Sequence, residues 1–339
     1  MSEEITFARM RVKPADFVVE EIPSFDPSGE GEHLLLTIRK NGVTTQQVVA
    51  ILAKWARIPL MGVGYAGIKD KHGITTQRFS VHLPKKVATD TAELNSDSVE
   101  VIDAQWHAKK LPRGAILGNA FVITLRDVEG DRNEIEQRLQ RVANEGFPNV
   151  FGAQRFGRGD NVAQALQMFR GKRVDRNLRS ILLSAARSEI FNRIVQARMA
   201  RGLYGTIHDG DVLMLEGTKS IFGPITVDDE LSERFNERDV IPTGPLWGGG
   251  ALRSSGDIAV LEEATVNDDP ELAELAEGLI KAGMKQERRA ITANAENLKW
   301  TWLDATTLRL NFNLVPGAYA TAMLAELGNV VDVKRGSAV

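Results

Sequence analysis

The stretch GVGYAGIKDKHGITTQ, from Gly62 to Gln77, decides how this chain is interpreted. Its first six residues match the pattern G-x-G-x-x-G, which in dinucleotide-binding folds follows a strand and opens a helix. Here Pro59 interrupts the segment before the glycines, and the β-branched residues that follow Gly73 are poor helix formers. The stretch therefore predicts a tight loop and not a dinucleotide site.

The second half of this loop places the carboxylate of Asp70 between Lys69 and Lys71. A lysine ammonium close to a carboxylate favours its ionised form, and an ionised carboxylate held in position can act as a nucleophile. The alternative is a charged surface turn, because such turns are common. The pattern alone leaves both interpretations open.

The composition is that of an ordinary globular protein. The chain has 339 residues, 43% of them hydrophobic and 26% charged, and this length suggests roughly two domains. The absence of cysteine excludes disulfides, thiolate nucleophiles and cysteine-based metal sites. The histidines lack metal-ligand spacing, so we assign no metal. We find no secretory signal and no stretch long enough to span a membrane, so we expect a cytoplasmic protein without membrane contact.

Charge is distributed unevenly along the chain. The formal net charge is −3, with 42 basic and 45 acidic residues. The segment from Phe151 to Arg201, however, contains eleven basic and only three acidic residues. A second basic cluster consists of Lys109, Lys110 and Arg113. A near-neutral protein with one strongly basic segment indicates a polyanionic partner, although a solvated helix face is the alternative.

The hydrophobic pattern favours an α+β fold. Strands are predicted at 33–39, 78–83, 99–106, 120–125 and 301–313, and helices after a capping box at Thr44–Gln47 and at 133–144, 178–201 and 271–285. The Pro- and Gly-rich stretch from Val240 to Gly256 predicts a long loop. The order of strands and helices lacks a regular βαβ rhythm, which argues against a doubly wound sheet.

Five motifs give the chain a recognisable resemblance. They are PADFVVEEI (Pro14–Ile22), GIKDKHGITTQ (Gly67–Gln77), LPRGAILGNAF (Leu111–Phe121), NVFGAQRFGRGDN (Asn149–Asn161) and NFNLVPGAYAT (Asn311–Thr321). In order and spacing they resemble the TruD family of tRNA pseudouridine synthases, and the resemblance spans almost the whole chain.

The resemblance implies an isomerase that breaks the N-glycosidic bond of a uridine in tRNA and rejoins the base through carbon 5. Family precedent points to position 13, with Asp70 as the catalytic aspartate and no metal or organic cofactor. The carboxylate attacks the base at carbon 6 or the ribose at C1′, or it assists loss of a C2′ proton, and these routes stay open. The resemblance implies no obligatory protein partner.

Phe17, Asn119, Phe121 and Phe312 match family active-site positions, Lys69 would favour the ionised form of Asp70, and the basic clusters would meet the RNA phosphates. The substrate-binding candidates are Phe17, Lys69, Asn119, Phe121 and Phe312. An isolated phenylalanine is more often a core residue, but a base that leaves its stack needs aromatic faces. The RNA-binding candidates are Lys109, Lys110, Arg113, Arg155, Arg158, Arg173, Arg176 and Arg179.

By the same resemblance, the chain divides into a pseudouridine-synthase-like catalytic domain with a mixed or antiparallel sheet and an inserted α/β domain specific to the family. We expect residues 1–145 and 297–339 to form the catalytic domain and residues 146–296 the insertion, with RNA lying between them.

Two other functions use the same residues. A non-catalytic RNA-binding or RNA-chaperone protein on this scaffold has the same electrostatics. A glycosidase-type hydrolase uses paired carboxylates, for which Asp70 and Glu21 are the candidates.

Overall fold

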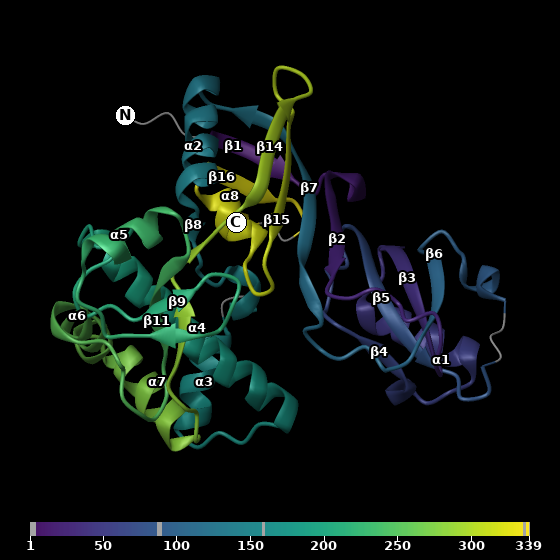
Figure 1. Cartoon of the computed structure of the whole chain (residues 1–339), viewed down its shortest axis with the longest axis horizontal. Helices are drawn as coiled ribbons and strands as arrows, with labels where there is room; N and C mark the ends of the chain where they lie inside the picture. Colours follow the sequence, from purple (N-terminus) through teal and green to yellow (C-terminus); the bar gives the residue numbers. More distant parts are fainter. Residues whose placement is uncertain (1–4, 87–89, 158–159, 335–336, 339) are drawn as a thin grey trace. The chain divides into compact units, whose positions relative to one another are not determined.

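The computed structural model describes residues 5–86, 90–157, 160–334 and 337–338, and the chain forms two compact units (Figure 1). Unit 1 comprises Met1–Ala143, Ala295–Gly317 and Leu324–Val339, and unit 2 comprises Asn144–Asn294 and Ala318–Met323. The domain boundaries expected after residues 145 and 296 stay a prediction. Among the described residues no helix combines the length and apolarity needed to cross a membrane.

A mixed sheet forms the framework of unit 1. Its strands follow the order β17-β16-β1-β7-β2-β5-β3-β6, with β15 and β14 beside β7 and with β4 beside β5. The strands are β1 (Ile5–Met10), β2 (Phe17–Pro23), β3 (His33–Asn41), β4 (Val63–Tyr65), β5 (Ile74–His82), β6 (Val99–His107), β7 (Ile116–Glu129), β14 (Glu296–Trp302), β15 (Leu308–Leu314), β16 (Gly328–Asp332) and β17 (Ser337–Ala338). Two pairs, β1–β16 and β2–β5, are parallel and the rest antiparallel, which confirms the predicted α+β class.

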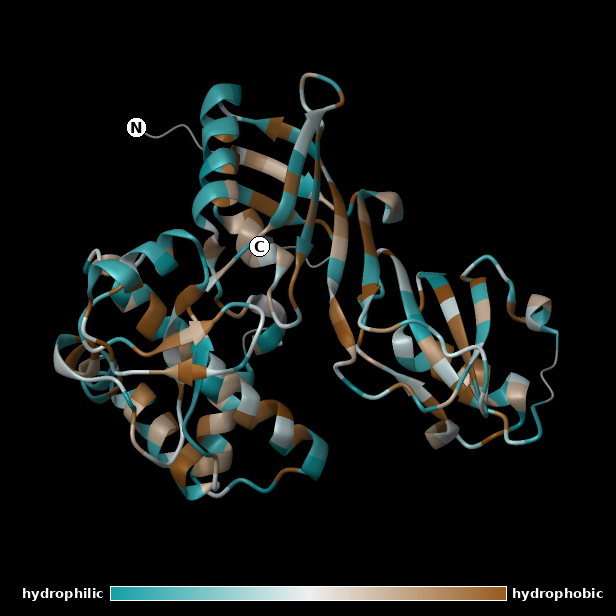
Figure 2. Ribbon diagram, viewed as in Figure 1, coloured by the Kyte–Doolittle hydropathy of each residue, from teal (hydrophilic) through white to brown (hydrophobic). Residues whose placement is uncertain are grey.

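The helices of unit 1 begin where the sequence predicts. Helix α1 (Thr45–Ala56) starts at a capping box, in which Gln47 N–H donates to Thr44 Oγ1 and Thr44 N–H donates to Gln47 Oε1. The apolar face of α1 packs on one face of β3 and β5, where Leu36 and Phe79 are fully buried. Helix α2 (Arg132–Glu145) buries Ile135, Leu139 and Val142. Figure 2 shows apolar residues alternating with polar ones along several strands.

Unit 2 is organised around its longest helix, α4 (Arg176–Ala200). The apolar side of α4 shares a core with α3 (Asn161–Phe169), α6 (Gly256–Asn267) and α7 (Pro270–Lys281). A four-stranded sheet has the order β10-β9-β11-β12, and β8 pairs with β13. The remaining elements are β8 (Phe147–Pro148), β9 (Leu213–Leu215), β10 (Ile221–Phe222), α5 (Asp229–Asn236), β11 (Val240–Leu246), β12 (Glu287–Ala290), β13 (Thr292–Ala293) and α8 (Ala320–Ala325), of which α8 continues into the last segment of unit 1.

The predicted loop from Val240 to Gly256 is wrong for its first part. Residues Val240–Leu246 form β11, which pairs with β9 and β12 on its two sides. Prolines at 242 and 245 disfavour a central strand because they lack an amide hydrogen. The carbonyl of Pro242 nevertheless accepts from Ile291 N–H at 2.9 Å, so the strand forms where these prolines supply acceptors only.

The predicted strand at 301–313 is in fact part of an antiparallel hairpin. Strands β14 and β15 pair from Glu296↔Asn313 to Trp302↔Leu308, and the chain turns between them. Both ends of the predicted segment are strands, but a turn at Asp304 separates them.

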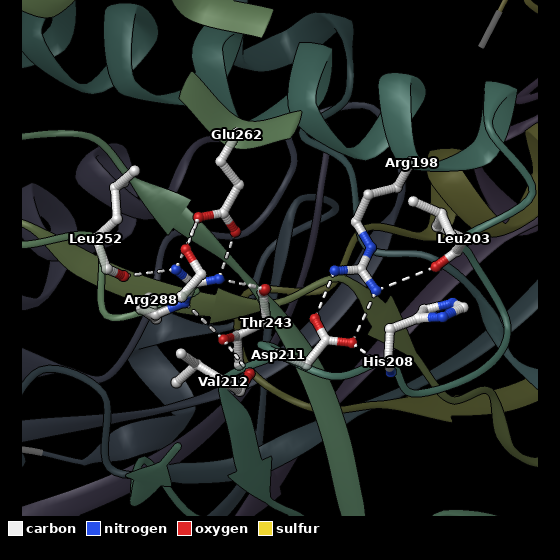
Figure 3. Close-up of polar contacts among 10 residues, drawn as sticks. Arg198, Leu203, His208, Asp211, Val212, Thr243, Leu252, Glu262 and Arg288 are labelled. Atoms are coloured by element: carbon white, nitrogen blue, oxygen red, sulfur yellow. Dashed lines mark hydrogen bonds and ion pairs between the residues drawn. The ribbon is translucent and has the colours of Figure 1, made fainter. Parts of the chain in front are cut away.

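Two buried ion pairs lie in unit 2 (Figure 3). Arg288 Nη2 lies 2.6 Å from Glu262 Oε1, and Arg198 Nη1 lies 2.6 Å from Asp211 Oδ1. All four side chains are at most 1% exposed. Thr243 lies near both pairs, since it accepts from Arg288 Nε and donates to the carbonyl of Val212. Removal of one partner leaves a buried charge uncompensated, which is more costly than the pair is stabilising.

We predict that Glu262→Ala lowers the free energy of unfolding by roughly 3–5 kcal/mol, because it leaves the buried guanidinium of Arg288 without its carboxylate partner. The neighbouring Glu263 is exposed, and Glu263→Ala is the matched control, with an expected change within about 0.5 kcal/mol. Urea unfolding of both variants measures the difference. Equal stabilities would show that the pair contributes little.

Candidate active site

The loop between β4 and β5 carries Asp70 and is fixed by contacts from its neighbours. Regular structure stops at Tyr65 and resumes at Ile74, so no helix follows the glycines and the dinucleotide interpretation is excluded. Gln77 Nε2 donates to the carbonyl of Gly67 at 3.0 Å. The hydroxyl of Thr45 donates to Gln77 Oε1 and accepts from Lys69 N–H, both at 3.0 Å.

The carboxylate of Asp70 is anchored by Arg11. Asp70 Oδ2 lies 2.7 Å from Arg11 Nη2, and Asp70 Oδ1 accepts from His72 N–H at 3.0 Å. The side chain of Asp70 is 22% exposed and that of Arg11 is 4% exposed. The carboxylate is thus held from its buried side and still reaches the surface. Its cationic partner Arg11 is the residue that follows β1, whereas the ammonium of Lys69, its neighbour in sequence, lies near Glu21.

Arg11 also binds a carboxylate near the C-terminal end of the chain. Its Nη1 lies 2.5 Å from Oδ2 of Asp332, the last residue of β16, whose side chain is 2% exposed. Arg11 itself has a φ of 60°, a left-handed conformation that non-glycine residues rarely adopt. The guanidinium therefore links the Asp70 loop to the paired strands β1 and β16.

Lys69 has a different partner. Its Nζ lies 3.1 Å from Glu21 Oε2, and the two side chains are 7% and 2% exposed. Arg78 N–H donates to the other oxygen of Glu21. Glu21 is thus neutralised inside unit 1, which disfavours a hydrolase that uses Asp70 and Glu21 as paired open carboxylates.

A buried lysine fixes the backbone at Asp70. Lys40 is 1% exposed, and its Nζ donates to the carbonyl of Asp70 at 2.6 Å and to that of Val43 at 2.9 Å. Burial lowers the pKa of Lys40 from 10.5 to about 8, an effect that the charge of Asp70 opposes and that of Lys69 reinforces. Lys40 and Arg11 together hold the main chain and the side chain of Asp70.

Three predicted aromatic residues form a continuous row that starts at Arg11. The Arg11 guanidinium lies 3.9 Å from the centre of the Phe17 ring. The Phe17 ring meets that of Phe121 edge-on at 6.2 Å, and Phe121 stacks on Phe312 at 5.3 Å with an interplanar angle of 13°. Phe17 and Phe312 are buried and Phe121 is half-buried.

Asn119 belongs to the same face of the sheet. It lies opposite Glu21 on β2 and Leu314 on β15, while Phe121 lies opposite Phe312. Directly opposed residues on neighbouring strands point to the same side. Asn119 Oδ1 is buried and accepts no hydrogen bond from the part of the chain that the structure describes. A buried acceptor of this kind is costly to leave unpaired and suits a ligand donor.

The structure brings Asp70 and the predicted aromatic residues together through Arg11, but they do not line an open cavity that lies elsewhere in unit 1. That cavity, of about 750 Å³, lies beside β4 and α1 and includes Lys110 and Arg113 among its lining residues. Lys109 is exposed nearby in sequence. In the described residues no group of three or more His, Asp and Glu side chains is arranged to hold a metal ion.

The basic segment of unit 2 is less available to a partner than its sequence suggests. Arg170, Arg187, Arg193 and Arg198 pair with the distant acids Glu274, Glu287, Asp269 and Asp211, respectively. The acids that seemed remote in the sequence thus neutralise part of the segment. The exposed bases include Arg173, which precedes α4, and Arg176 and Arg179 in its first turn.

Arg155 of the F-G-A-Q-R-F-G motif is half-buried and engaged within unit 2. It donates to Ser184 Oγ at 2.8 Å and to the Tyr319 hydroxyl at 2.7 Å. Its guanidinium also lies 5.1 Å from the Phe151 ring centre. Arg158 lies outside the described residues.

Sequence reasoning missed Arg11, Lys40 and Asp332. Lys40 was detectable from the sequence. It lies at an alternate position after Leu36 and Ile38 on β3, on the buried side of the strand, where a charged residue is unusual. Arg11 and Asp332 left none, since their contact joins opposite ends of the chain.

The pKa of Lys40 predicts a pH dependence of stability. The folded-state value of about 8 lies below the ordinary 10.5, so between these values the unfolded state binds more protons and stability rises with pH. Wild type should therefore gain unfolding free energy relative to Lys40→Met as pH rises from about 8 to about 10.5. Urea unfolding of both proteins across this range measures it, and exposed Lys54→Met controls for loss of a lysine charge. A pH-independent difference would contradict the assignment.

Comparison with known proteins matches this chain to one family. A family model for tRNA pseudouridine synthase D (TruD) matches residues 1–166 and 158–327. The tRNA pseudouridine synthase D of Xanthomonas axonopodis pv. citri is 50% identical over 344 residues, which cover 97% of this chain and 93% of that protein. The protein of the same name from Aeromonas hydrophila subsp. hydrophila is 41% identical over 329 residues, covering 96% and 92%.

A solved structure shares the fold. The crystal structure of a Methanosarcina mazei protein assigned as tRNA pseudouridine synthase D has a TM-score of 0.72 and 20% sequence identity, covering 96% of this chain and 94% of that one. The family match and the identities of 50% and 41% over nearly the whole chain are decisive for membership. The chain belongs to the TruD family of tRNA pseudouridine synthases, and the isomerase class predicted from its motifs is confirmed.

Proposed function

We propose that this chain converts the uridine at position 13 of tRNA to pseudouridine, with Asp70 as the nucleophile. The observation that carries the proposal is the Arg11–Asp70 pair, 2.7 Å long and adjacent to the Phe17 ring. It places an anchored carboxylate with a fixed counter-charge beside an aromatic row. A nucleophilic carboxylate needs such positioning more than it needs intrinsic reactivity.

The reaction is an isomerisation and needs no second substrate. The bond from C1′ to N1 breaks, a bond from C1′ to carbon 5 forms, carbon 5 loses a proton and N1 gains one. Attack at carbon 6, attack at C1′ and loss of the C2′ proton all require an ionised carboxylate within reach of the nucleoside. Asp70, held by Arg11 and by the Lys40 contact to its carbonyl, suits each route.

The aromatic row supplies a replacement for the stacking that a flipped uridine loses. Stacking on an aromatic ring is worth roughly 1–3 kcal/mol per base. Phe121 is the half-buried ring of the row, and we assign it as the face closest to the base, with Phe17 and Phe312 behind it. Asn119 Oδ1, a buried acceptor, suits the N–H of a uracil edge.

Exposed bases support contact with tRNA phosphates. Arg176 and Arg179 occupy the first turn of α4, whose end is capped by Asp175. A cation at a helix N-terminus interacts unfavourably with the helix dipole, at a cost of roughly 0.3–1 kcal/mol in stability. A contribution to helix stability therefore does not explain why Arg176 and Arg179 are there. We assign them, with Arg173, Lys109, Lys110 and Arg113, to the RNA phosphates, and we retain Arg155 and Arg158 as candidates.

We predict that Asp70→Asn abolishes pseudouridine formation while tRNA binding changes little. Loss of a nucleophile typically reduces the rate by roughly a thousandfold or more, whereas RNA affinity resides mainly in the basic residues. The measurement is pseudouridine mapping in tRNA from cells that lack the protein, complemented with wild type or with Asp70→Asn. Position 13 should carry pseudouridine only with wild type.

The matched control is Asp97→Asn, which changes an exposed aspartate of the same unit. It should restore the modification fully. If Asp70→Asn restores the modification at the wild-type rate, Asp70 is not the nucleophile. If wild type itself binds tRNA without forming pseudouridine, the chain is a non-catalytic RNA-binding protein.

A further inference from the structure

The open cavity of unit 1 combines an apolar floor with a basic rim. Val49, Val63 and Leu111 supply the floor, and Met61 on its edge is 80% exposed. Lys110 and Arg113 are its charged lining residues, and no aspartate or glutamate of the described part of the chain lines it. A volume of about 750 Å³ lies within the range of small-molecule sites, roughly 300–1,000 Å³.

The segment that carries Lys110 and Arg113 is fixed against β4 before any ligand arrives. Leu111 N–H donates to Ser80 Oγ at 2.9 Å, and Gly114 N–H donates to the carbonyl of Ala66 at 2.9 Å. A Cβ at Gly64 would lie 2.8 Å from the carbonyl oxygen of Leu111. Glycine at this position therefore permits the close approach, and the two cations are held in place without a loop closure.

Arg113 offers a flat cationic surface. Its guanidinium carbon lies 3.3 Å from the centre of the Tyr65 ring, and Gln46 Nε2 donates to the Tyr65 hydroxyl at 2.5 Å. Tyr65 is buried, while Arg113 is exposed. RNA-binding proteins use arginine planes of this kind to stack unpaired bases.

The chemistry of the cavity matches one nucleotide. An apolar floor accepts a base, a guanidinium plane stacks on it, and two cations attract its phosphate. A peptide or a lipid fits less well. The cavity has cations but no acidic lining residue among those described, and its volume suits one small molecule or nucleotide. Charge complementarity therefore favours an RNA strand as the occupant.

We infer that this cavity binds one unstacked nucleotide of the tRNA, distinct from the uridine that reacts at Asp70. The inference rests on the proposed function and extends it to a second base-binding site. Neither Asp70 nor the rings of Phe17 and Phe121 line the cavity. Tyr65 and Asp70 are five residues apart, so their Cα atoms lie within about 18 Å. The bound nucleotide is consequently close to the target in the folded tRNA.

The test is tRNA binding and steady-state kinetics with an unmodified tRNA transcript. Arg113→Ala removes the stacking plane, and Arg113→Lys keeps the charge without the plane. Ala50→Trp fills the cavity from α1, where Ala50 is exposed. Each should raise KM and the Kd for tRNA by about 5- to 100-fold, with kcat within about threefold. Lys54→Ala, an exposed lysine on the same helix, should leave both constants unchanged.

Two outcomes would overturn the inference while the proposed function stands. If wild type forms pseudouridine and both Arg113→Lys and Ala50→Trp bind tRNA normally, the cavity does not hold a nucleotide. If Arg113→Ala weakens binding but Arg113→Lys and Ala50→Trp do not, the site supplies charge alone. Photocrosslinking from a benzophenone side chain at Met61 gives a separate readout, because a seated nucleotide yields one mapped crosslink near position 13 and an empty cavity yields scattered ones.

Discussion

The guanidinium of Arg11 bridges two carboxylates, and the arrangement of the loop that carries Asp70 depends on this contact. One nitrogen binds Asp332 at the end of β16 and the other binds Asp70. The parallel pairing of β1 with β16 brings these groups together from opposite ends of the chain. A carboxylate held in this way has a fixed position and counter-charge before substrate arrives, and such preorganisation is where enzymes gain most of their electrostatic stabilisation.

Buried cations recur among the described residues, and they bind defined partners. Lys40 binds two carbonyls, Lys69 binds Glu21, and Arg288 binds Glu262. Buried charges are tolerated only when they are paired or well hydrogen-bonded. Part of the basic character of the sequence therefore serves the fold, and the exposed lysines and arginines that remain are the ones to consider for RNA.

The sequence predicted local structure better than long-range contacts. The capping box at Thr44 and the alternation along β3 are local signals, and both are confirmed. Strand β11 was not predicted, because its prolines are typical of a loop. Its pairing with β9 and β12 is a long-range contact that the local sequence does not show. The glycine residues around Asp70 predicted the loop, but its contacts were not predictable from its neighbours in sequence. Lys69 pairs with Glu21, and only the folded chain reveals that Arg11 binds Asp70.

The most direct measurement is the single-turnover rate of pseudouridine formation by Arg11→Met with enzyme in excess over tRNA. We expect the rate to fall by roughly a hundredfold or more, because Asp70, the proposed nucleophile, would lose its alignment, while the Kd for tRNA stays within about threefold. Arg9→Met removes a partly exposed arginine two residues earlier, on β1, which pairs with Asp127, and should react at the wild-type rate. An Arg11→Met enzyme as fast as wild type would show that the bridge does not position Asp70 for reaction.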